Sequence, residues 1–191
     1  MKKKIGFYMG SFDPIHIGHI ATIMKVLQEG QVDEVMVVPA IANPAKKHAP
    51  ADINQREVMI KAAILDMGDI GKNVFVSHGK GIADPDGKFY SYRQLSEIIE
   101  LEPRLAETDN YIIAGTDTAR MIPKWRNSKQ ILSKFGIIEI ERPGFSKDGD
   151  PENGIKCSSS RIREMIEDGN NPYPWIPISV WEVIKTYGLY G

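Results

Sequence analysis

The chain alternates short apolar runs with segments of helical periodicity, and this alternation limits the possible fold more than any other feature. Strands are predicted over the apolar runs 5–9, 35–38, 74–76, 111–114 and 135–140. Between the first two runs, Ile20, Ile23, Met24 and Leu27 recur at helical spacing, and Gly30 ends the pattern. Strands joined through helices predict βαβ units, a mostly parallel sheet and helices on both of its faces.

Further segments carry helix signals. Asp52, with Gln55 three residues later, resembles a capping box that opens a helix. Helices are also predicted over 92–101, 159–168 and 178–187, and Gly169 and Gly188 stand after the last two. Since no repeat or low-complexity tract interrupts the pattern, we expect a single domain over 1–191, with a helical C-terminal part of about 158–191 packed on it.

Composition narrows the class of protein. The 191 residues include 24 Lys and Arg against 25 Asp and Glu, without the basic excess that coating a nucleic acid or an anionic membrane requires. The single cysteine excludes an internal disulfide and a four-cysteine zinc site. The longest apolar run, 35–42, is broken by Pro39 and is much shorter than the roughly 20 residues of a membrane helix. We therefore expect a cytoplasmic protein that binds neither nucleic acid nor membrane.

The loop after the first predicted strand is the strongest candidate site. It reads Gly10-Ser11-Phe12-Asp13-Pro14-Ile15-His16-Ile17-Gly18-His19 and leads into a helix. That arrangement aims backbone N–H groups and the positive end of the helix at an anion such as phosphate. His16 and His19 share one side of the first helical turn and can donate to phosphate oxygens, while Gly10 and Gly18 allow close approach of a ligand. The competing interpretation is that the histidines cap the helix or bind a metal, although the sequence offers no evident third metal ligand.

A second candidate phosphate site is Cys157-Ser158-Ser159-Ser160-Arg161-Ile162-Arg163, at the start of another predicted helix. Hydroxyl groups at a helix start can cap it or bind phosphate, and the planar fork of arginine matches phosphate oxygens. Without other information, a serine N-cap followed by solvated arginines explains this segment equally well. We expect Cys157 to be a small buried apolar residue.

The pattern Gly-x-Phe-x-Pro-x-His-x-Gly-His at 10–19 resembles the signature of the nucleotidyltransferase α/β-phosphodiesterase superfamily, which transfers a nucleotidyl group and releases pyrophosphate. Residues 157–163 are similar to its second motif, Ile-Ser-Ser-Thr-x-Ile-Arg, with Cys157 and Ser160 as mild departures. The resemblance implies a Rossmann-like, doubly wound α/β fold, and catalytic roles for His16 and His19 on the transferring phosphate. The ATP ligands that it implies are Gly10, Ser11, Phe12, His16, Gly18, His19, Asp117, Ser159, Ser160 and Arg163, whereas Arg161 occupies a variable position.

The middle of the chain resembles the nicotinate mononucleotide adenylyltransferases. Gly115-x-Asp117 followed by seven residues and Trp125 resembles a family pattern in which the Asp binds adenosyl or ribose hydroxyls and the Trp stacks on the pyridine ring. Tyr90 and Ser91 match the turn that holds the acceptor, while Phe89 departs from it, which leaves nicotinate against nicotinamide open. Lys46 and Lys47 are candidate phosphate contacts, with no preference between them. The pair Gln55-Arg56 and the C-terminal Tyr187-Gly188-Leu189-Tyr190 also resemble the family, in structural roles.

The resemblance implies an enzyme that transfers AMP from ATP to nicotinate mononucleotide, forming deamido-NAD and pyrophosphate in NAD biosynthesis. Magnesium would be carried on the ATP phosphates rather than in a protein cage. Three alternatives are the same reaction on nicotinamide mononucleotide, a phosphopantetheine adenylyltransferase, and a non-catalytic nucleotide sensor. His16 and Trp125 disfavour the phosphopantetheine enzyme. The expected partners are ATP and a pyridine mononucleotide, and the oligomeric state stays open, a homo-oligomer included.

Overall fold

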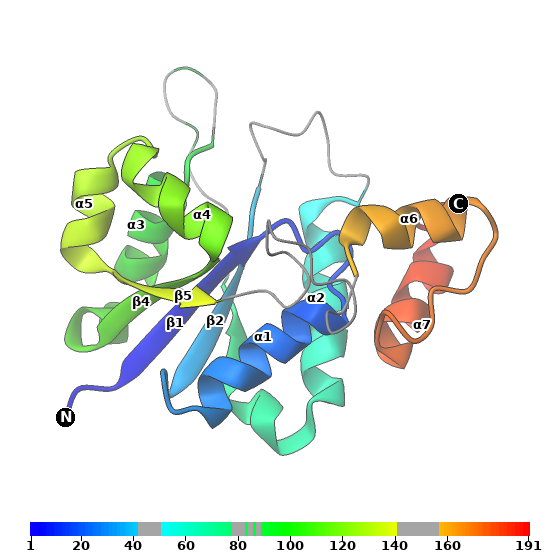
Figure 1. The fold of residues 1–191 in the computed structure, drawn as a ribbon, viewed down its shortest axis with the longest axis horizontal. Helices are drawn as coiled ribbons and strands as arrows, with labels where there is room; N and C mark the ends of the chain where they lie inside the picture. Colours follow the sequence, from blue (N-terminus) through cyan, green and yellow to red (C-terminus); the bar gives the residue numbers. More distant parts are fainter. Residues whose placement is uncertain (42–50, 78–82, 84–85, 87–88, 141–156) are drawn as a thin grey trace.

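A parallel sheet of five strands forms the centre of the protein (Figure 1). This computed structural model describes residues 1–41, 51–77, 83, 86, 89–140 and 157–191. The strands are β1 (Lys4–Gly10), β2 (Glu34–Pro39), β3 (Val74–Val76), β4 (Asp109–Gly115) and β5 (Gly136–Ile140). They lie in the order β3-β2-β1-β4-β5, and each neighbouring pair is parallel. The order reverses between β1 and β4, so the carboxyl ends of these two strands flank the crevice where such sheets bind ligands.

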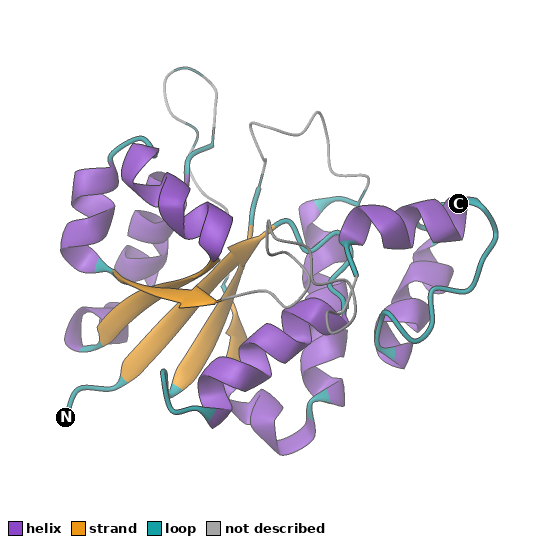
Figure 2. Cartoon of the chain, viewed as in Figure 1, coloured by secondary structure: helices purple, strands orange, loops and turns teal. Residues whose placement is uncertain are grey.

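Helices cover both faces of this sheet (Figure 2). They are α1 (Ile17–Gln28), α2 (Ile53–Asp66), α3 (Ser91–Leu101), α4 (Thr116–Met121), α5 (Ser128–Lys134), α6 (Ser159–Glu167) and α7 (Ile178–Tyr187). Short 3-10 helices span Gly68–Asn73, Pro103–Glu107 and Ile122–Lys124. Among the described helices, none is long and apolar enough to span a membrane.

Successive residues of the central strand face two different cores, because side chains of a strand alternate between its faces. Phe7 lies in a core with residues of α3 and α5, whereas Tyr8 lies in a core with residues of α1, α2, α6 and α7. The same alternation continues on β2, where Met36 joins the first core and Val37 the second. Both faces of the central strands β1 and β2 are therefore buried, which explains why these strands read as nearly continuous apolar runs.

Most of the predicted elements are confirmed. The Asp52–Gln55 capping box is present at the start of α2. Gly30, Gly169 and Gly188 all have positive φ angles just after α1, α6 and α7, where a left-handed residue ends a helix. Two helices that the sequence analysis does not predict, α4 and the helix Ile122–Lys124, follow β4. These helices are too short to show a helical repeat in the sequence.

Candidate active site

The two histidines of the first loop begin α1 by capping it. His16 is the N-cap residue, and its Nδ1 accepts the Gly18 N–H at 3.1 Å. His19 Nδ1 in turn accepts the His16 N–H at 3.2 Å, which completes a reciprocal capping box. A neutral imidazole carries one hydrogen, and since both Nδ1 atoms are acceptors here, that hydrogen must be on Nε2. Capping and phosphate binding are therefore compatible: Nδ1 holds the helix, and Nε2–H is the donor for an anion.

Close packing fixes the orientation of both rings. The His16 and His19 ring centroids are 3.7 Å apart, and the Phe12 ring meets His19 edge-on at 4.9 Å. A Cβ at position 18 would lie 3.1 Å from two atoms of the His16 ring, and one at position 10 would lie 3.0 Å from the Phe12 ring. Gly10 and Gly18 thus have a steric role in placing the rings.

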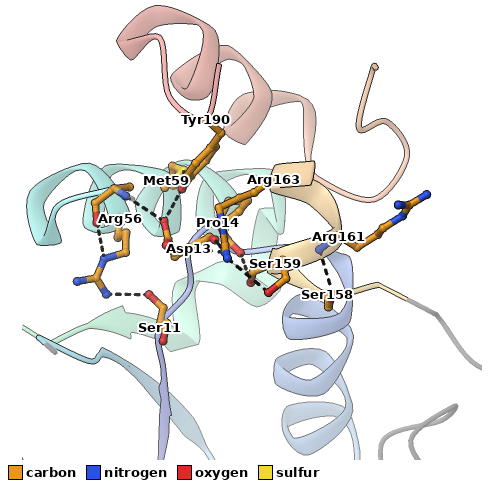
Figure 3. Close-up of polar contacts among 12 residues, drawn as sticks. Ser11, Asp13, Pro14, Arg56, Met59, Ser158, Ser159, Arg161, Arg163 and Tyr190 are labelled. Atoms are coloured by element: carbon orange, nitrogen blue, oxygen red, sulfur yellow. Dashed lines mark hydrogen bonds and ion pairs between the residues drawn. The ribbon is translucent and has the colours of Figure 1, made fainter. Parts of the chain in front are cut away.

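Phe12 adopts a left-handed backbone conformation, with a φ angle of 49°. For a residue with a side chain this costs about 1 to 2 kcal/mol, so neighbouring contacts must hold it. One such contact is Arg56, a buried residue of α2 that is 2% exposed. Its Nη1 donates to Ser11 O at 2.8 Å (Figure 3). The same nitrogen donates to Ala40 O at 2.7 Å, and Nε donates to Ala51 O at 3.2 Å. Arg56 therefore ties the first loop to the segments after β2 and before α2.

Asp13 is a second buried charge beside the histidines, with 3% of its surface exposed. Its Oδ1 accepts the Tyr190 hydroxyl at 2.6 Å and the Ala51 N–H at 3.3 Å. Its Oδ2 lies 3.8 Å from Arg163 Nη1. A buried carboxylate is tolerated only with such partners, and these come from the segment before α2, from α6 and from the C-terminal end of the chain.

The start of α6 lies directly against the first loop, although the two segments are far apart in sequence. Ser159 Oγ donates to Pro14 O at 2.9 Å, and Arg163 Nη1 donates to Asp13 O at 2.6 Å (Figure 3). Arg163 Nη2 also lies 3.4 Å from Ser160 Oγ. Ser158 is the N-cap of α6 and accepts the Arg161 N–H, and the Arg161 side chain is 66% exposed. The two motifs therefore form one site, with Arg161 at its solvent side.

Cys157 is buried immediately before α6, as the sequence predicted. Its thiol lies 3.7 Å from Trp175 O. Burial raises the pKa of Cys157 to about 11, although a hydrogen bond from the Gly18 backbone acts in the opposite direction. The thiol is therefore protonated near neutral pH and is a poor nucleophile. A hollow of about 240 Å³ opens beside it, lined by Cys157, Ser158, Arg161, Ile162, Met165 and Trp175.

The expected acceptor residues gather around the start of α3. Tyr90 is the N-cap of α3, and Ser91 is its first residue. The guanidinium of Arg126, the neighbour of Trp125, lies 4.8 Å from the centre of the Tyr90 ring. The Tyr90 hydroxyl and Arg126 Nη1 both donate to Asp86 Oδ2, at 2.8 Å and 3.0 Å. The structure thus brings the Tyr90 turn beside the segment that carries Trp125.

Two other predicted positions have different outcomes. Asp117 is exposed in the first turn of α4, directly after the carboxyl end of β4. Lys46 and Lys47 lie outside the described residues. Within the described residues, no group of three or more His, Cys, Asp and Glu side chains is placed to hold a metal ion.

Sequence reasoning did not identify Asp13, Arg56 and Tyr190 as one network around the histidine loop. The sequence shows Asp13 only as part of the loop, and the family resemblance implies only structural roles for Arg56 and Tyr190. A usable signal was an arginine among the apolar residues of α2, since a buried arginine needs several acceptors. Which acceptors it would find depended on the tertiary structure.

Comparison with known proteins shows the family to which the chain belongs. Residues 7–165, from β1 into α6, match the family described as cytidylyltransferase-like. The fold and the two joined motifs define a nucleotidyltransferase, and the chain belongs to the cytidylyltransferase-like family. A Clostridium tetani protein named probable nicotinate-nucleotide adenylyltransferase is 32% identical over 210 residues, covering 100% of both chains. Within that class, the protein is therefore a member of the nicotinate-nucleotide adenylyltransferase family.

Other relatives point the same way. An Oceanobacillus iheyensis protein of the same name is 27% identical and covers 99% of this chain and 97% of its own. The solved structure of Plasmodium falciparum nicotinic acid mononucleotide adenylyltransferase complexed with NaAD superposes with a TM-score of 0.71. It shares 22% sequence identity and covers 98% of this chain and 97% of its own, so it confirms the Rossmann-like α/β fold.

Proposed function

We propose that the protein transfers the adenylyl group of ATP to nicotinate mononucleotide, releasing pyrophosphate and forming deamido-NAD. The observation that carries this proposal is the contact of α6 with the histidine loop, through Ser159 to Pro14 O and Arg163 to Asp13 O. It places His16, His19, the hydroxyls of α6 and an arginine at the carboxyl end of β1. The Clostridium tetani relative carries the name of this activity.

In this reaction an oxygen of the acceptor phosphate attacks the α-phosphorus of ATP. A new P–O bond forms, the bond to the β-phosphate oxygen breaks, and pyrophosphate leaves with the electron pair. The protein needs no covalent intermediate, because the acceptor phosphate is itself the nucleophile. The Nε2–H groups of His16 and His19 would donate to the phosphate oxygens as negative charge redistributes in the transition state. A preorganised donor of this kind contributes about 2.7 to 4 kcal/mol.

We assign the acceptor to the side of the site where Tyr90, Ser91 and Trp125 lie, and we assign Asp117 to ATP. Trp125 is half-buried beside the core that contains Phe7, so its ring is held in place. The side chain of Tyr90 makes no capping bond to α3, which leaves the first N–H groups of that helix suited to a carboxylate. This favours nicotinate mononucleotide over its amide, which has no negative charge on the ring.

We propose that magnesium enters with ATP. The described donors at the site are ring N–H, hydroxyl and guanidinium groups, which suit phosphate oxygens, whereas magnesium prefers oxygen ligands and phosphates. Bound there, magnesium would neutralise phosphate charge. We expect EDTA to abolish turnover and excess Mg²⁺ to restore it, while the thermal unfolding midpoint of the ligand-free protein stays unchanged. A lower midpoint in EDTA would contradict this assignment.

The test of function is pyrophosphate release from ATP, measured with nicotinate mononucleotide, nicotinamide mononucleotide and phosphopantetheine in parallel. We expect the highest kcat/KM with nicotinate mononucleotide. Preference for either other acceptor would replace the proposal with the corresponding activity. Binding of ATP without pyrophosphate release on any acceptor would identify a nucleotide sensor. We also place the reaction in the cytoplasm, which the single buried cysteine fits.

A further inference from the structure

We infer that Tyr190, the next-to-last residue, is a positioning residue for adenylyl transfer, because its hydroxyl fixes Asp13 and thereby the loop that carries the two histidines. The inference rests on the proposed function for its kinetic part. Its structural part, the dependence of the loop on the Tyr190 hydroxyl, can be measured without turnover.

Among the described contacts of the Asp13 carboxylate, the hydrogen bond from the Tyr190 hydroxyl has the shortest distance. It donates to Oδ1 at 2.6 Å, whereas the Ala51 N–H is 3.3 Å from the same oxygen (Figure 3). Burial and the hydrogen bond to Asp13 raise the pKa of Tyr190 far above its ordinary range, so it keeps its proton at any working pH. Replacing the hydroxyl with hydrogen would leave Oδ1 with only the longer contact.

Asp13 is coupled through the backbone to both parts of the site. It follows Phe12, whose left-handed conformation must be held and whose ring touches the His19 ring. The Asp13 carbonyl oxygen also accepts a hydrogen bond from Arg163, and the Pro14 carbonyl oxygen accepts one from the Ser159 hydroxyl. A shift of Asp13 would therefore move Phe12 against His19 and weaken the junction with α6. Tyr190 is thus connected to His19 through Asp13 and Phe12.

Contacts in the C-terminal segment hold the Tyr190 hydroxyl in position. Ser179 anchors α7 to α2, because its Oγ lies 3.0 Å from Ala62 O and 2.7 Å from Asp66 Oδ2 and its one hydrogen can be donated to either. Gly188, with a φ angle of 59°, ends α7, and the buried Leu189 follows. Tyr190 itself has a φ angle of 68°, a conformation that costs energy in a residue with a side chain. Positive φ angles thus occur at Tyr190 and at Phe12, the neighbour of Asp13, and the Tyr190–Asp13 contact is one of those that hold these conformations.

The first experiment compares Tyr190→Phe with the wild type and with Tyr187→Phe, in full-length protein. Tyr187 is a suitable control because it lies three residues earlier and is 52% exposed. Since small misplacements of catalytic groups can cost up to about 100-fold in rate, we expect kcat to fall roughly 10-fold in Tyr190→Phe. The KM for ATP should change less than about 3-fold, because the ring and the phosphate donors are still present. Tyr187→Phe should match the wild type.

The second experiment measures amide hydrogen exchange in peptides that cover 11–19, on the ligand-free proteins. We expect faster exchange in Tyr190→Phe only, with exchange in the strands β1 and β4 unchanged. Absence of turnover in the wild type would defeat the proposed function, yet the exchange comparison would still decide the role of Tyr190. An unchanged kcat overturns the inference, and so does a loss of kcat without faster exchange in 11–19.

Discussion

The imidazole rings of His16 and His19 pack against each other, with centroids 3.7 Å apart and planes tilted by 30°, and each ring accepts a backbone N–H of the same helical turn. One nitrogen of each histidine therefore builds the helix, and the other is the donor that the proposed chemistry needs. This division of labour explains how a pair of histidines can be structural and catalytic together.

The division can be tested by replacing each histidine with asparagine or alanine. An asparagine side-chain oxygen can take the place of Nδ1 as a cap acceptor, but it offers nothing at the place of Nε2. We expect His19→Asn and His16→Asn to lower kcat/KM by at least about 100-fold, because the phosphate donor is lost. Their free energy of unfolding should stay within about 0.5 kcal/mol of the wild type.

The alanine variants supply the contrast. His16→Ala should lose the same activity and also about 1 kcal/mol of stability, because the helix cap is removed as well. Steady-state kinetics and urea unfolding measure the two effects separately. Near-normal activity in His19→Asn or His19→Ala would disprove the assignment of the site.

The contacts of Arg56 predict that its conservative replacement by lysine lowers the stability of the fold strongly. Its Nε and Nη1 reach three carbonyl oxygens in different segments, and a lysine ammonium cannot reproduce that fork. Burial lowers the pKa of Arg56, and the Asp13 charge partly offsets this. We expect Arg56→Lys to lower the free energy of unfolding by about 2 to 4 kcal/mol in urea titration.

The matched control for Arg56 is Arg161→Lys on α6, where the side chain is 66% exposed. An exposed substitution of this kind should change stability by less than about 0.5 kcal/mol. Equal stability of the two variants would mean that the three carbonyl contacts of Arg56 contribute nothing.

Glu34 predicts a pH-dependent contribution to stability. Burial alone raises the pKa of Glu34, but hydrogen bonds from Lys3 and Arg104 outweigh it and hold the pKa below the ordinary value of 4.5. A carboxylate with a lowered pKa stabilises the fold above the pKa of the unfolded chain, and this stabilisation is lost as the pH falls through the folded value. Both partners are about half exposed, so Glu34→Gln should cost only about 1 to 2 kcal/mol at pH 7.

The measurement is urea unfolding of wild type and Glu34→Gln between pH 7 and pH 3. The stability difference should be constant down to about pH 5 and shrink below the ordinary pKa of 4.5. Glu139→Gln, at an exposed position of β5, serves as the control and should change the free energy of unfolding by less than about 0.5 kcal/mol. A difference that grows in acid would reverse the sign and refute the argument.

Trp125 predicts a selective effect on the acceptor. If its ring stacks on the pyridine, Trp125→Leu should raise the KM for nicotinate mononucleotide roughly 10-fold, since an aromatic stacking contact is worth about 1 to 3 kcal/mol. The KM for ATP should change little. Trp181→Leu, a half-buried tryptophan on α7, is the control. Equal increases in both KM values for Trp125→Leu would indicate a general packing role.

Much of the fold could be predicted because each signal was local. The capping box at Asp52, the apolar runs of the strands and the glycines that end α1, α6 and α7 act over a few residues. The short helix α4 was missed because six residues are too few to show a helical repeat. The contact of α6 with the first loop was expected only through the family resemblance.

The sequence by itself determined the alternation of strands and helices, the two faces of the sheet and the histidine motif, because these depend on periodicity and on spacing within a few residues. Only the tertiary structure decided which groups hold that motif in place. Asp13 receives Tyr190 from a position 177 residues away, and Arg163 from one 150 residues away. Nothing in the local sequence around Asp13 specifies either partner. The contacts of Asp13 with Tyr190 and Arg163 depend on how α6 and α7 pack against α2 and the sheet. That packing places both partners beside the buried carboxylate, which holds the first loop in position.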